Sequence, residues 1–190
     1  EDDTEQIFYR DGLIEKAVEN YSQGGLDGEA ARLLVDYGRP DEAAKLYETR
    51  LHDFTAAATV FEKAGQTKLA ADMYRKAGKA DQAYDVLIAG ALEEGDSLQA
   101  ARWMYEAEKY AKVVELLAPE LQDSEPTAER LEAFYLLAMS LKREKAYGEA
   151  RRLFEGIVAV ESHYKDAAIQ LKNIQETVVV AGQATAAVGN

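Results

Sequence analysis

The sequence predicts an all-α fold, an α-solenoid of about ten to eleven short antiparallel helices. Two observations support this fold class. A helix-sized unit containing a pair of alanines recurs about every 13 residues, which leaves room for only one helix per copy. Proline occurs only three times in 190 residues, and no long segment alternates β-branched with polar residues, so helix is favoured over strand.

The recurring unit places small and large side chains at fixed positions. Its second alanine falls at Ala31, Ala44, Ala58, Ala71 and Ala101, and three residues later a large residue follows: Leu34, Tyr47, Phe61, Tyr74 and Met104. Small residues let two helices approach closely, while the large residue one turn later fills the groove of a neighbour. We therefore expect the repeated aromatic residues, Tyr47 among them, to belong to the core.

Start and stop signals delimit the individual helices. Residues 1–6 are mostly acidic and are expected to form a frayed end, after which apolar periodicity from Ile7 predicts a first helix that ends at Gly24 and Gly25. Thr55 and Ser97 are expected to cap the helices that follow them. The further helices are predicted at 27–37, 41–53, 56–64, 67–78, 81–94, from Ser97 onward, and at 111–117.

Prolines interrupt this regular pattern in one place. Pro119 and Pro126 lie close together, with Asp123 and Ser124 between them. Proline inside a helix removes a hydrogen bond and clashes with the preceding turn. We therefore expect a seam at 118–126, after the compressed helices of 13–117.

Residues 131–164 resemble a single tetratricopeptide repeat. The side chains at its marker positions are Phe134, Leu137, Ala138, Leu141, Ala150 and Phe154, while Ile157 and Ser162 depart from the usual pattern. Residues 27–117 resemble the compressed tetratricopeptide-like hairpins of trafficking and coat proteins. The resemblance implies a right-handed superhelix and a single solenoid over 7–177. Within it, the repeat spans 127–164 and a capping helix 165–177, followed by an uncharged, linker-like tail at 178–190 that favours a fragment of a longer protein.

The chain offers little that could perform catalysis. It contains no cysteine, and its two histidines, His52 and His163, lie in different repeats without a second ligand at helical spacing. The glycine spacing of 90–97 imitates a phosphate-binding loop, but Asp96 occupies the position of the essential lysine. We therefore predict a protein that is not an enzyme and has no metal site and no cofactor.

Charge and hydropathy narrow the class of partner. The formal net charge of −13 disfavours nucleic acid, and no apolar stretch is long enough to insert into a membrane. The absence of cysteine fits a reducing, cytoplasmic setting. The class of partner that is compatible with these observations is a protein or peptide of basic or mixed charge.

The tetratricopeptide resemblance also implies where a partner would bind. The first helix of such a repeat lines its concave side, and the inward positions correspond here to Glu132, Tyr135, Met139, Lys142 and Arg143. Trp103 is a further candidate contact, because it flanks Met104 together with Tyr105 and these three side chains cannot all face the core.

The leading functional hypothesis is a non-catalytic scaffold that binds a protein or peptide partner through the solenoid surface. One alternative is a rigid spacer or a self-association module. Another is an accessory domain of an enzyme whose active site lies outside these residues. The repeat itself specifies packing, so it does not choose between the three.

Overall fold

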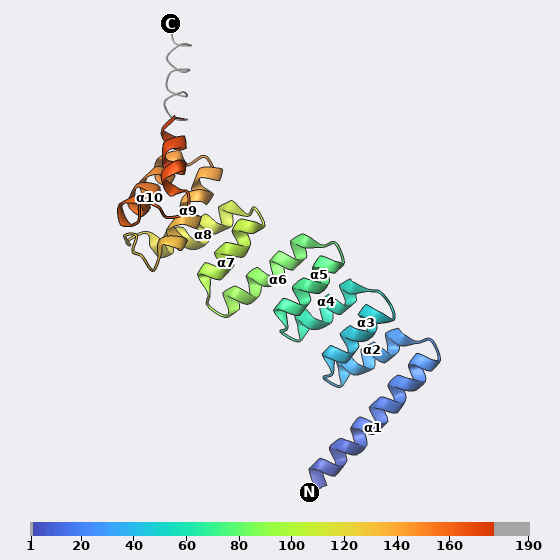
Figure 1. Cartoon of the computed structure of the whole chain (residues 1–190). Helices are drawn as coiled ribbons and strands as arrows, with labels where there is room; N and C mark the ends of the chain where they lie inside the picture. Colours follow the sequence, from blue (N-terminus) through green and yellow to red (C-terminus); the bar gives the residue numbers. More distant parts are fainter. Residues whose placement is uncertain (1, 177–190) are drawn as a thin grey trace. The chain divides into compact units, whose positions relative to one another are not determined.

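The computed structural model describes residues 2–176, and the side chains of residues 10–176. Within that part of the chain every regular element is a helix, which confirms the all-α prediction. The bounds are α1 Asp2–Gln23, α2 Asp27–Asp36, α3 Pro40–Thr49, α4 Phe54–Lys63, α5 Thr67–Lys76, α6 Ala80–Glu93, α7 Ser97–Glu106, α8 Tyr110–Leu121, α9 Leu131–Arg143 and α10 Tyr147–Val160 (Figure 1). A further helical segment runs over 167–176.

The helices fall into two compact units whose boundary lies between Gly90 and Ala91, inside α6. In the first unit, helices α1 to α5 each pack on the next along the chain. In the second unit, α7 packs on α8, α8 on α9 and α9 on α10, and α7 also contacts α9. Contacts between successive helices are those that a helical repeat requires.

The alanine pairs belong to the buried core of the first unit. The pairs in α2 to α5 are all buried, with exposed fractions of 0–1% for Ala30, Ala31, Ala43, Ala44, Ala57, Ala58, Ala70 and Ala71. Ten-residue helices are marginal in isolation, so this packing must hold them in place. The alanine pairs are therefore buried between helices that pack on one another, as the expected role requires.

The second unit has a larger apolar core. Phe134, Phe154, Ile157 and Ile174 are 0–1% exposed, and they come from α9, α10 and the helical segment 167–176. The connection after α8 also packs closely, because a Cβ added to Gly156 would lie 2.9 Å from Cγ of Pro126. This core fixes the side of α9 that remains available for polar contacts.

Two helices extend further than the sequence predicts. Helix α1 begins at Asp2, so residues 2–6 lie within it rather than before it. Pro119 lies inside α8, which continues to Leu121, so the first part of the expected seam at 118–126 is helical. The predicted tail at 178–190, and residue 177 of the predicted cap, lie outside the described residues.

Two predicted caps are also misplaced. Asp53 caps α4, since its Oδ1 accepts a hydrogen bond from the Ala56 amide at 2.9 Å, while Thr55 already lies inside the helix. Asp96 caps α7 in the same way, at 2.9 Å from the Gln99 amide, and Ser97 is the first helical residue. In both cases a carboxylate shortly before the predicted cap satisfies the first turn.

Candidate interaction surfaces

Helix α9 carries the five residues that the sequence singled out on one side and the core of the second unit on the other. Its buried side includes Leu131, Phe134 and Leu141. Of the five candidates, Glu132, Tyr135, Met139 and Lys142 are half-buried and Arg143 is exposed. Four of them contact other elements of the same unit. The role of all five in binding a partner stays a prediction.

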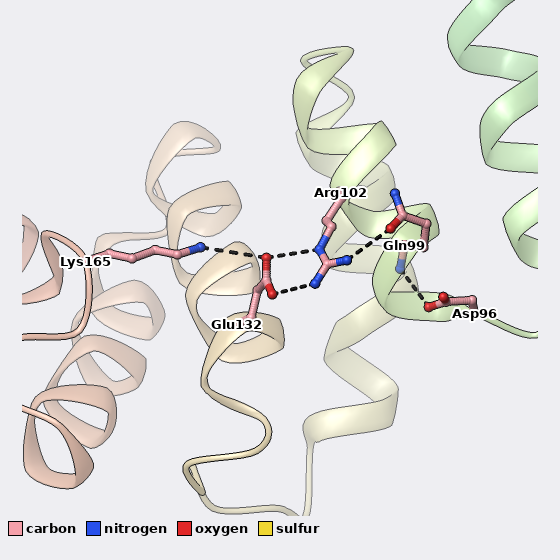
Figure 2. A network of polar contacts seen from close by, with 5 residues as sticks. All are labelled: Asp96, Gln99, Arg102, Glu132 and Lys165. Atoms are coloured by element: carbon pink, nitrogen blue, oxygen red, sulfur yellow. Dashed lines mark hydrogen bonds and ion pairs between the residues drawn. The ribbon is translucent and has the colours of Figure 1, made fainter. Parts of the chain in front are cut away.

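Glu132 is the centre of a charged network (Figure 2). Its carboxylate accepts two hydrogen bonds from Arg102 of α7, from Nε at 3.0 Å and from Nη2 at 2.6 Å. Lys165 Nζ lies 3.8 Å from the same carboxylate, on the side opposite Arg102. Gln99 accepts a further hydrogen bond from Arg102 Nη1 at 3.0 Å. The network therefore joins α7, α9 and the segment that follows α10.

Tyr135 is the centre of a second group of contacts. Its hydroxyl donates a hydrogen bond to Asp166 Oδ1 at 2.5 Å, and its ring meets the rings of Phe154 and Tyr164 edge to face. Lys165 Nζ lies 4.7 Å from the centroid of the Tyr135 ring, within the range of a cation–π interaction. The same lysine thus contacts both Glu132 and Tyr135.

The segment 165–176 is bound to α9 by further polar contacts. Lys142 donates a hydrogen bond to Gln170 Oε1, and Gln170 Nε2 donates one to Asp166 Oδ2 at 2.6 Å. Together with the bond from Tyr135 to Asp166, these contacts make a continuous row along α9. The row holds the start of the last described helix in a defined register.

At the C-terminal end of α9, a cation lies against two tyrosines. The Arg143 guanidinium is 5.5 Å from the centroid of the Tyr110 ring, and Tyr105 meets Tyr110 edge to face at 5.3 Å. Trp103 is half-buried on α7 and contacts other residues of the chain. Tyr105 is half-buried too, so neither residue beside Met104 is fully exposed.

The environment of these groups shifts their pKa values. The hydrogen bond from Arg102 lowers the pKa of Glu132 despite partial burial. Burial, and then the hydrogen bond to Asp166, raises the pKa of the Tyr135 hydroxyl. Burial alone would raise the pKa of Asp166, but hydrogen bonds from Tyr135 and Gln170 outweigh it and lower that pKa. Both carboxylates are therefore ionised at neutral pH.

We call this set of residues the α9 face: Arg102, Tyr105, Tyr110, Glu132, Tyr135, Met139, Lys142, Arg143, Tyr164, Lys165, Asp166 and Gln170. It contains four basic and two acidic side chains, an excess of positive charge in a chain whose net charge is −13. Four of the chain's tyrosines also lie in it. Arg102 and Lys165 were not anticipated from the sequence, because one lies in a repeat copy and the other in the predicted cap.

A separate candidate surface, a hollow, lies in the first unit. It is a groove of about 390 Å³ whose walls are Arg32, Val35 and Asp36 of α2 and Thr59, Val60 and Lys63 of α4. Tyr47 of α3 lies between these walls and also lines the groove. Tyr47 is only half-buried, so its assignment to the core is wrong, whereas Leu34, Phe61, Tyr74 and Met104 are buried as predicted.

The residues that the structure describes contain no group of three or more His, Asp or Glu side chains that could hold a metal ion. Over the same residues, no helix has both the length and the apolar character needed to cross a bilayer. Comparison with protein-family models found no match for this chain, and comparison with curated proteins found none either.

Proposed function

We propose that this chain is a non-catalytic interaction scaffold, a tetratricopeptide-like solenoid that binds a protein or peptide partner through the α9 face, in the cytoplasm. The observation that supports this function is the composition of that face. It combines tyrosine with arginine, two of the residue types that contribute most to binding energy in protein interfaces, and its Lys165 lies over a tyrosine ring. The Glu132 carboxylate pairs with both Arg102 and Lys165 and so orients them.

Arg143 is the residue of this face best suited to contact a partner. Its side chain is exposed, and its described contacts are with the Tyr110 ring and with the Tyr105 hydroxyl, both neutral partners. By contrast, Arg102 is held by two hydrogen bonds to Glu132. A guanidinium resting on a ring keeps several N–H donors available for a carboxylate or a carbonyl oxygen.

Capture of a partner by the purified chain tests this function. The immobilised wild-type chain would be exposed to a lysate of the source cells, beside the variants Arg143→Glu and Arg151→Glu. Arg151 is the control, because it is exposed on α10 and its described ion pair is with Glu155 of its own helix. We expect Arg143→Glu to reduce capture about tenfold or more, the loss of one good charged contact, and Arg151→Glu to retain it. Equal capture by both variants, or no partner together with turnover of a small substrate, contradicts the proposal.

Self-association is the second candidate function, and α1 supports it. Among its described side chains only Ile14 is buried, whereas Leu13 is 51% and Tyr21 39% exposed. Exposed large apolar residues on one helix can pack against a second copy. Sedimentation at increasing concentration would detect a dimer, and Leu13→Glu would abolish it.

A further inference from the structure

The groove at Tyr47 coincides with a break in the repeat. The connection between α3 and α4, residues 50–53, is one residue longer than the connections 37–39 and 64–66 on either side. An additional residue shifts the helix that follows it relative to the helices before it. Tyr47 occupies the same repeat position as buried Leu34 and Phe61, yet it is left half-buried.

The groove has an apolar centre between polar edges. Val60 is 9% exposed and Val35 is 38% exposed, and the Tyr47 ring lies between their two helices. Among the residues with described side chains, no hydrogen bond reaches the Tyr47 hydroxyl and no carboxylate pairs with Lys63. The groove therefore offers apolar surface, a phenol and an unpaired ammonium group to a ligand.

The charges at the edges favour a ligand with carboxylates. Two cations, Arg32 on α2 and Lys63 on α4, face one acidic residue, Asp36. The pair between Arg32 and Glu29 is largely exposed, with side-chain fractions of 70% and 52%, so it is weak and readily exchanged for another carboxylate. The residues that line the groove therefore carry two positive charges and one negative charge, although the chain as a whole is acidic.

We propose that this groove binds a short peptide segment of a partner protein, with an aliphatic side chain flanked by carboxylates. The aliphatic side chain packs on Val35, Val60 and the Tyr47 ring, and the carboxylates reach Arg32 and Lys63. The Tyr47 hydroxyl donates a hydrogen bond to a peptide carbonyl. This inference rests on the proposed scaffold function and assigns it a second, independent contact surface.

The test uses three blocked hexapeptides and backbone amide chemical shifts of the whole chain. The first peptide is Glu-Glu-Val-Leu-Glu-Glu, the second replaces its glutamates by lysines, and the third replaces its apolar residues by serines. We expect the first peptide to shift the amides of Val35, Thr59 and Lys63 in a saturable manner, at least about fivefold more tightly than the other two. No saturable shift there, or equal binding of the lysine peptide, overturns the proposal.

Variants of the groove sharpen the test. Lys63→Glu should weaken the first peptide about fivefold or more, whereas the matched control Lys45→Glu, exposed on α3 outside the groove, should not. Asp36→Asn should tighten binding, because it removes a repelling carboxylate. Equal weakening by Lys63→Glu and Lys45→Glu overturns the inference. Amide shifts at the groove that depend only on protein concentration also overturn it, because they would indicate that a second copy of the chain binds there. Capture that depends on Arg143 would still support the scaffold function if the groove fails, so the two failures are distinguishable.

Discussion

At the scale of single residues, Ser140 is a polar side chain that is fully buried. It is 0% exposed on α9, and its Oγ has no hydrogen-bond partner among the residues that the structure describes. A buried hydroxyl without a partner costs roughly 1–3 kcal/mol of stability. We therefore expect Ser140→Ala to raise the free energy of unfolding by about 1 kcal/mol in urea titrations. Exposed Ser162→Ala is the control and should change little; a destabilised Ser140→Ala would show that the hydroxyl has a bound water or partner.

Lys145 adopts a backbone conformation that is unfavourable for a residue with a side chain. Its φ is 64°, in the left-handed region that glycine adopts without strain. Replacing lysine by glycine should therefore raise the free energy of unfolding at this position and lower it at a position inside a helix. We expect Lys145→Gly to stabilise the second unit by about 0.5–1 kcal/mol, and Lys112→Gly, inside α8, to destabilise it by about 1 kcal/mol. Thermal unfolding of both variants measures this; a destabilised Lys145→Gly contradicts it.

At the scale of elements, carboxylates bind the segment after α10 to α7 and α9. The pKa values of Glu132 and Asp166 are both lowered in the folded chain. Groups of this kind contribute stability above their unfolded pKa, and that stability is lost as pH falls through the folded value. The second unit should therefore lose stability in acid, below about pH 4.5, the ordinary value for glutamate.

Glu132→Gln isolates this contribution. At neutral pH it should lower the free energy of unfolding by about 1 kcal/mol, since it breaks a partly exposed bidentate pair. At pH 3 and below, the difference from wild type should shrink as the wild-type carboxylate is protonated. Glu155→Gln, in an exposed pair on α10, is the control and should have little effect. A Glu132→Gln difference that stays constant across this pH range contradicts the assignment.

Elements were easier to predict from the sequence than the contacts between them. The alanine pairs and the large residues after them have a periodicity that local sequence carries directly, and the helices follow it. Tyr47 was misassigned because the extra residue at 50–53 changes packing without changing the local pattern. Arg102 and Lys165 contact Glu132 only through tertiary packing. Arg102 lies 30 residues before Glu132 in the sequence, so no local pattern predicts this contact.

At the scale of the whole molecule, stability in a helical repeat is carried mainly by contacts between neighbouring helices. Each unit has its own buried residues, such as Phe61 in the first and Phe154 in the second. Removing one of these side chains should cost about 3–5 kcal/mol locally. Its effect on helices distant in sequence should be much smaller, because opening can be confined to a few neighbouring helices.

Hydrogen exchange of Phe154→Ala and Phe61→Ala measures this confinement. We expect Phe154→Ala to accelerate exchange in α9, α10 and 167–176, with little change in α2 to α4. Phe61→Ala should do the reverse, accelerating exchange in α3, α4 and α5 and sparing α9 and α10. Because each variant is the other's control, a general loss of stability cannot imitate the result. Equal acceleration throughout the described helices, in both variants, would mean that the chain unfolds as one cooperative body rather than as neighbouring helices.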